Sequence, residues 1–162
     1  MTETRWVGSK ARDVGGYKLW YLRRDKHRNG VDILVDEEFR GQVVEIKRVK
    51  ARFWEDLDVV VRSVTSAEKI VLVGDFNGHI GVLPGGYDDV HSSFGFGVRN
   101  GEGMDLLDFA RAFELVVVNS SFPKKEDHLI TFRSAKAKTQ IDFLLLRKGD
   151  RVLCKDCKVI PS

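Results

Sequence analysis

The sequence predicts a mixed α/β fold in a single domain spanning residues 1–162. The continuous apolar run 70–74 is typical of a strand that is buried on both faces of a sheet, and residues 141–146, apolar except for Asp142, predict a further buried strand. Between residues 51 and 65, apolar side chains recur at the spacing of an amphipathic helix. A domain of this length can bury roughly 70% of its unfolded surface, and ten Phe and three Trp supply side chains for its core.

Three strands are predicted before this helix. Residues 17–21 are aromatic-rich, and a second apolar run follows at 31–35. Between them, Asn29-Gly30 is a strong signal for a hairpin turn, so residues 17–35 are predicted to form one β-hairpin. Residues 43–49 form the third predicted strand.

A long loop and a second helix are predicted after the strand at 70–74. Residues 77–103 are rich in Gly, Asp and Ser, which is typical of a loop. The helix that follows is marked by apolar residues at helical spacing: Met104, Leu107, Ala110 and Phe113. Strands at 115–118 and 141–146 complete the prediction.

Charge is distributed in three blocks along the chain, whose total is +3. Residues 1–52 carry a net +5, residues 53–118 a net −7, and residues 119–162 again a net +5. An acidic middle between basic ends suits a site where carboxylates gather a cation while basic flanks hold a polyanion such as DNA. The same pattern also fits the solvated faces of helices and loops.

Composition excludes several classes of protein. No apolar run approaches the roughly 20 residues of a membrane span, and the first residues lack the basic and apolar segments of a signal peptide. Two Cys are too few for a disulfide framework. The Gly-rich stretch 94–101 follows no predicted strand and lacks Gly-Lys-Ser/Thr, so no small-molecule cofactor is predicted. We expect an intracellular protein with no membrane partner, in the nucleus in preference to the cytoplasm.

Side chains suited to metal and phosphate chemistry follow the strand at 70–74. In extended backbone, Asp75 and Asn77 point to the same side and place a carboxylate beside a carboxamide. The carboxylate can bind Mg²⁺ or take a proton from water, and the amide can donate to a phosphate oxygen. Gly74 and Gly78 allow backbone or substrate to come close. An Asx-type turn that closes the strand is the structural alternative.

A second carboxylate, Asp142, lies inside the apolar run that continues from Gln140. An isolated carboxylate is costly to bury, so Asp142 requires a partner or a function. The structural alternative is that Asp142 begins an edge strand and faces water.

Four motifs in order, residues 3–6, 73–79, 131–134 and 140–145, resemble successive motifs of the endonuclease/exonuclease/phosphatase superfamily. Gly-Asp-x-Asn in the second motif is the most specific of them. The closer resemblance is to the endonuclease domains of LINE-type retrotransposons and to craniofacial development protein 2-like proteins. It covers essentially the whole chain. The resemblance implies a four-layer α/β sandwich, in which two mixed or antiparallel sheets are flanked by helices.

The resemblance implies a phosphodiesterase that depends on Mg²⁺ (or Mn²⁺) and nicks DNA to leave a free 3′ hydroxyl. Carried over by position, Glu3 would ligate the metal, which would neutralise charge on the phosphate and on the leaving oxygen. Asp75 would orient or deprotonate the attacking water, and Asn77 would hydrogen-bond the scissile phosphate. Asp142 would orient a catalytic histidine.

Three parts of the family pattern have no counterpart in the sequence. The family begins with an Asn-bearing strand, whereas only two residues precede Glu3. Where the family has further strands and a Tyr-containing loop, only residues 50–52 connect the predicted strand to the helix. The strand with the catalytic histidine would follow Ser162, and none of the four His replaces it by motif. We therefore expect a truncated domain with weak or no nuclease activity, because acid–base catalysis typically contributes roughly 10²–10⁴-fold.

Two other functions stay open: a non-catalytic nucleic-acid-binding or vestigial domain, and a phosphatase of the same superfamily. Cys154 and Cys157 form a lone CxxC and are predicted to be free thiols. Asn119 opens a glycosylation sequon that carries no weight without a secretory signal. Basic side chains for a nucleic-acid backbone, which fit solvated loops equally well, are Arg99, Lys136, Lys138, Arg147, Lys148 and Arg151.

Overall fold

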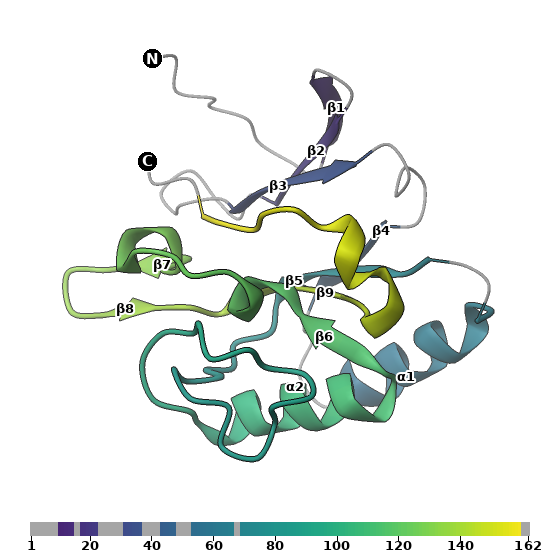
Figure 1. The fold of residues 1–162 in the computed structure, drawn as a ribbon. Helices are drawn as coiled ribbons and strands as arrows, with labels where there is room; N and C mark the ends of the chain where they lie inside the picture. Colours follow the sequence, from purple (N-terminus) through teal and green to yellow (C-terminus); the bar gives the residue numbers. More distant parts are fainter. Residues whose placement is uncertain are drawn as a thin grey trace.

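The computed structural model describes residues 53–66 and 69–159 in full, together with the backbone of four strands before residue 48. Its helices and sheets confirm the predicted α/β class (Figure 1). The strands are β1 Lys10–Val14, β2 Tyr17–Leu22, β3 Val31–Asp36, β4 Val43–Lys47, β5 Val71–Asp75, β6 Leu115–Val117, β7 Phe132–Arg133, β8 Lys138–Thr139 and β9 Asp142–Arg147. The helices are α1 Phe53–Ser63 and α2 Gly101–Ala112, with 3-10 helices η2 Val118–Ser121, η3 Glu126–His128 and η4 Lys148–Leu153.

The strands form two larger sheets and one small hairpin. β1, β2 and β3 pair antiparallel in that order, and Tyr17 opposite Asp36 confirms the hairpin predicted for residues 17–35. The turn predicted at Asn29 and Gly30 lies outside the described residues. The second sheet has the order β4-β5-β9-β6, in which only β4 and β5 are parallel. β7 and β8 pair with each other.

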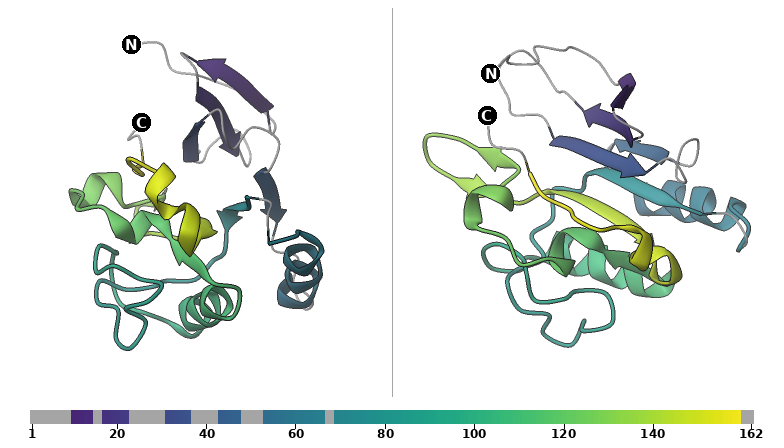
Figure 2. Two further views of the ribbon diagram at one scale, coloured as in Figure 1. Left: turned by 45° about the vertical axis from the view of Figure 1, so that its right-hand side comes forward. Right: turned by 45° about the horizontal axis from the view of Figure 1, so that its top comes forward.

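The central strands β5 and β9 are buried on both faces, as their apolar sequences predicted. Leu72 and Leu145 belong to the core on one face of the sheet, and Val73 and Leu144 to the core on the other. Both described α-helices cover the first face, while the C-terminal segment crosses the second (Figures 1 and 2). Aromatic rings fill the layer between helices and sheet: Phe53, Trp54, Phe76, Phe109 and Phe143. None of the helices described is long and apolar enough to cross a membrane.

The long loop predicted from residue 77 is confirmed as far as Asn100. Asn100 is the N-cap of α2, because its side-chain oxygen accepts a hydrogen bond of 2.9 Å from the amide of Gly103. The helix therefore begins at Gly101, three residues before the apolar pattern that marks it in the sequence.

Arg99 holds the middle of this loop together. Its guanidinium donates to the carbonyl oxygens of Ile80 at 2.9 Å, Leu83 at 2.5 Å and Pro84 at 2.6 Å. It also lies 5.0 Å from the centre of the Tyr87 ring. These contacts engage the donors of the guanidinium within the loop, so Arg99 has a structural role there.

His91 is a second internal support of the loop and is almost fully buried. Its Nδ1 accepts a hydrogen bond from the amide of Ser93 at 3.1 Å, so the neutral ring carries its proton on Nε2 and donates to Gly81 O at 2.9 Å. Burial is the main cause that lowers the pKa of His91, and the charge of Arg99 acts in the same direction, against the hydrogen bond to Gly81.

Stability is expected to fall as the pH drops below about 6.5, the ordinary pKa of histidine. The folded state lowers the pKa of His91, so below that pH the unfolded chain binds more protons than the folded one and is favoured. Urea unfolding at pH 7.5 and 5.0 measures the effect, with His91→Gln as the comparison. The same fall in the variant as in the wild type would show that His91 is not its source.

Candidate active site

The pairing of β5 with β9 brings two predicted site residues together. Asp75 lies directly opposite Asp142 in the antiparallel register. One residue further, the amide of Phe76 donates to Ile141 O at 2.9 Å, so the two aspartates occupy a non-hydrogen-bonded position, where facing side chains are closest. Both residues are half-buried. Two carboxylates thus share one end and one face of the sheet.

The strand ends directly after Asp75 in a tight turn. Asn77 has a φ of 52°, in the left-handed region that Asn tolerates better than most residues. Its amide donates to Asp75 Oδ1 at 3.0 Å, which is the Asx-type turn given as the structural alternative. The extended backbone expected here is therefore wrong, and Asn77 does not share a face with Asp75 by strand alternation. Its side chain is exposed.

The turn is fixed against the first turn of α2. Asn100 Oδ1, besides capping the helix, accepts a hydrogen bond of 2.8 Å from the amide of His79. Gly78 approaches the helix so closely that a Cβ there would lie 2.7 Å from the carbonyl of Glu102. Gly78 thus serves the close backbone approach expected of it, and the turn carrying Asn77 is held rigidly.

Two buried polar side chains that sequence reasoning did not single out support the start of β9. Thr131 Oγ1 accepts hydrogen bonds from the amides of Ile141 at 2.9 Å and Asp142 at 3.2 Å. The side chain of Asn119 bonds the amide of Leu144 at 2.7 Å. Thr131 belongs to the motif 131–134. For Asn119, the only sequence feature noted is the glycosylation sequon, which does not indicate a role at this site.

Gln140 adds an unusual feature next to this pair. It is 1% exposed, and in the described structure neither its amide nitrogen nor its amide oxygen has a hydrogen-bond partner. A buried amide without partners is costly. The Gln-Ile-Asp motif therefore contains two unusual residues. Gln140 is buried without hydrogen-bond partners for its amide, and Asp142 lies opposite another aspartate.

The described donors match the ligand type of a magnesium site. Mg²⁺ in phosphate chemistry is bound through one or two carboxylates together with substrate phosphates, and Asp75 and Asp142 supply two hard oxygen groups. Within the residues described, no group of three or more His, Cys, Asp or Glu gathers as a closed metal site would require. Glu3, the predicted metal ligand, lies outside the described residues.

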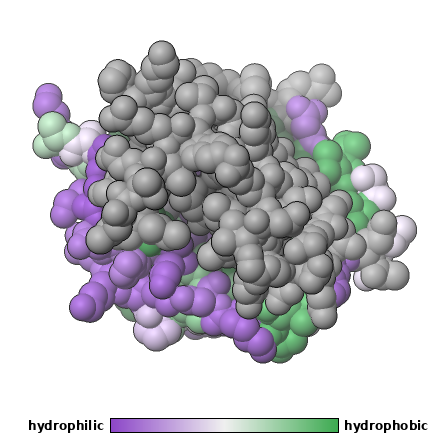
Figure 3. Space-filling model, turned by 90° about the horizontal axis from the view of Figure 1, so that it is seen from above, coloured by the Kyte–Doolittle hydropathy of each residue, from purple (hydrophilic) through white to green (hydrophobic). Residues whose placement is uncertain are grey.

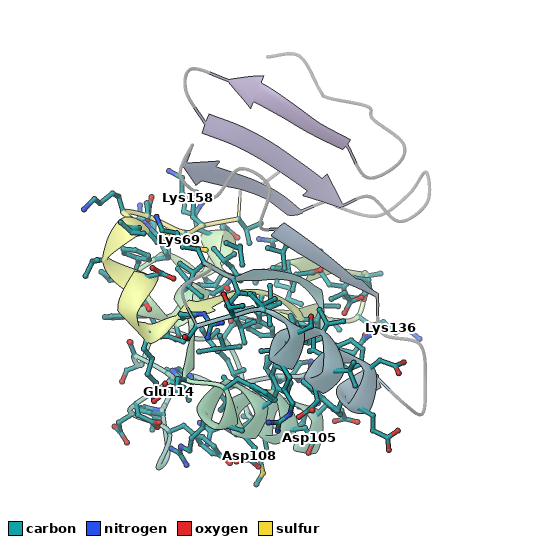
Figure 4. All side chains as sticks on the ribbon, turned by 90° about the vertical axis from the view of Figure 1, so that its right-hand side faces the viewer. Lys69, Asp105, Asp108, Glu114, Lys136 and Lys158 are labelled. Atoms are coloured by element: carbon teal, nitrogen blue, oxygen red, sulfur yellow. The ribbon has the colours of Figure 1, made fainter. Side chains whose placement is uncertain are left out.

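The basic residues considered for nucleic-acid contact divide into two groups. Arg147, Lys148 and Arg151 bond within the protein: to Thr65 O at 3.1 Å, to Asp89 at 3.0 Å and to Cys154 O at 3.1 Å, respectively. Lys136 and Lys138 are exposed on the hairpin of β7 and β8. Figure 4 shows Lys136 at the edge of the molecule, and in Figure 3 the described surface on the side of this hairpin is mainly hydrophilic.

Cys154 and Cys157 are both free, as predicted. They pack against the core on the second face of the sheet. Burial raises the pKa of Cys157 to about 12 and also raises that of Cys154. Thiols with a raised pKa are poor nucleophiles at neutral pH, so both act as packing groups.

No model of a known protein family matches the chain. It is similar to craniofacial development protein 2 from Tragulus javanicus and from Bos taurus, with 22% identity over 199 aligned residues in each case. The alignments cover 100% of this chain and 34% and 33% of the two relatives. The chain therefore spans about a third of the length of these relatives.

Proposed function

We propose that the chain is a Mg²⁺-dependent phosphodiesterase domain that acts on DNA, of the endonuclease/exonuclease/phosphatase type and of retrotransposon origin, with low activity. The observation that carries the proposal is the placement of Asp75 opposite Asp142 at the end of two buried strands. These residues come from two separate motifs of the resemblance, and strand pairing joins them in one place.

Each side chain has a role that its position supports. Asp75 would orient or deprotonate the attacking water, and its bond to the Asn77 amide fixes its direction. Asn77 is exposed on a rigid turn and would donate to an oxygen of the scissile phosphate. Bound Mg²⁺, held by Glu3, would neutralise charge on the phosphate and the leaving oxygen. Asp142 would orient a histidine.

Low activity is proposed because no histidine of the sequence matches the catalytic one by motif, and two of the three described histidines form hydrogen bonds elsewhere in the fold. His91 bonds Gly81 and Ser93 inside the loop, and His128 Nδ1 bonds Val159 O at 3.0 Å. A site without the histidine that Asp142 would orient loses that part of the acid–base catalysis, typically roughly 10²–10⁴-fold in rate.

Duplex DNA is the substrate that the neighbouring surface favours. The hairpin with Lys136 and Lys138 ends at Thr139, three residues before Asp142 in the sequence, and both lysines are exposed. Lys138 has one weak ion pair, 3.7 Å to Glu126, and keeps 54% of its side chain exposed. Exposed positive groups on this hairpin would hold the phosphate backbone.

Nicking of supercoiled plasmid in the presence of Mg²⁺ tests the proposal. The full chain is expected to nick slowly and to stop when the metal is chelated. Asp75→Ala should lower the rate roughly 10²–10⁴-fold. Asp105→Asn is the matched control, because Asp105 is exposed on α2 at the base of the molecule (Figure 4). Nicking at the wild-type rate by Asp75→Ala would refute the assignment.

Non-catalytic nucleic-acid binding is the second candidate, and the exposed Lys136 and Lys138 are the observation that favours it. This function predicts that the wild-type chain binds DNA with an affinity that falls steeply as salt is added, and that it does not nick the DNA.

A further inference from the structure

The β6–β9 ladder stops short of the aspartate pair. β6 ends at Val117, where the chain turns into η2. Continuing the observed register would set Val118 opposite Leu144 and Ser120 opposite Asp142. In that register a further strand residue would accept from the Leu144 amide and another would donate to the Asp142 carbonyl. The turn removes both partners from the end of β9 that carries the site.

The side chain of Asn119 supplies both missing partners. Its Oδ1 accepts from the amide of Leu144 at 2.7 Å, and its Nδ2 donates to the carbonyl oxygen of Asp142 at 3.5 Å. Asn119 is 8% exposed, so these bonds form away from water. The amide of Asp142 is held in turn by Thr131 Oγ1. Both backbone polar groups of Asp142 are therefore bonded by buried side chains.

We propose that Asn119 is a positioning residue for Asp142. Its amide replaces the last rung of the sheet and keeps the first residue of β9 in register, so that the carboxylate of Asp142 stays opposite that of Asp75. The effect on catalysis rests on the proposed function, whereas the effect on the strand end does not.

The geometry limits what the loss of this amide can do. Asn119 forms hydrogen bonds to Leu144 and Asp142, while β6 pairs with β9 from Leu145 onward and β5 pairs along the other side of β9. Removing the side-chain amide should therefore loosen the β6 side of β9 at Asp142 and Leu144 and leave its second half paired. A residue that merely stabilised the fold would change the whole strand evenly.

Amide hydrogen exchange in the full chain tests the strand end. In Asn119→Leu the amide of Leu144 should exchange roughly 10- to 100-fold faster, the factor expected for one buried hydrogen bond, while that of Leu72 on β5 changes much less. Ser121→Ala is the matched control, because Ser121 lies on the same turn and its hydroxyl bonds Val117 O at 3.5 Å. Asn119→Asp is the second variant if the leucine does not fold: it keeps the acceptor for Leu144 and should preserve its protection.

Nicking kinetics test the positioning itself. Asn119→Leu should lower kcat roughly tenfold or more, with little change in the KM for DNA, since the phosphate-binding groups are untouched. The inference would be overturned if the amides of Leu144 and Leu72 exchanged faster by the same factor. It would also be overturned if kcat were unchanged in a variant whose Leu144 amide exchanges faster. If the wild-type chain does not nick, the proposed function fails, while the exchange experiment still decides whether Asn119 holds the strand end.

Discussion

Gly103→Ala is expected to lower the free energy of unfolding by about 3 kcal/mol, because the site turn leaves no room for a methyl group. A Cβ on Gly103 would overlap the carbonyl of His79 and lie 3.0 Å from its amide nitrogen. These are backbone atoms that Asn100 fixes from the other side, so they cannot yield as a flexible side chain would. Relief requires a shift of the turn that carries Asn77.

Gly101→Ala is the matched control in the same helix. A Cβ at Gly101 meets nothing within 4 Å, and alanine favours helical backbone over glycine by about 1 kcal/mol. It should therefore be neutral or slightly stabilising. Urea unfolding of both variants at pH 7.5 gives the comparison; similar stabilities for the two would mean that the turn and α2 are not in tight contact.

The central strands could be predicted because an apolar sequence pattern indicates burial on both faces of a sheet. Residues 70–74 and 143–146 are continuous apolar runs that have no polar face to present to water, and β5 and β9 are buried on both sides. β1, Lys10–Val14, was not predicted, since Lys-Ala-Arg-Asp-Val lacks the apolar alternation of a strand and is identified only by its pairing with β2.

The residues of the candidate site were predictable by type but not by arrangement. Asp75 and Asp142 stood out as polar residues bordering apolar runs, yet only the register of β5 on β9 places one opposite the other. The prediction of extended backbone at Asn77 was wrong, because the side chain of Asp75 accepts a hydrogen bond from the Asn77 amide and so favours a turn over a strand. The partners of Arg99 could not be predicted either, because they are carbonyl oxygens of a loop that has no regular pattern.

A double substitution of the aspartates is expected to be no worse than a single one. Asp75→Asn and Asp142→Asn should each reduce Mg²⁺-dependent nicking roughly 10²–10⁴-fold, because each removes a charge on which the other depends. Both substitutions keep the size and most of the shape of the side chain. Folding should therefore be preserved, which thermal unfolding would check.

The most direct measurement is this double-mutant cycle on nicking by the full chain. If Asp75 and Asp142 form one site, the rate of the double variant will match that of the slower single variant, and the coupling between them will be nearly as large as either single effect. If the two losses multiply, or if either substitution leaves nicking at the wild-type rate, the aspartates act separately and the proposed site is wrong.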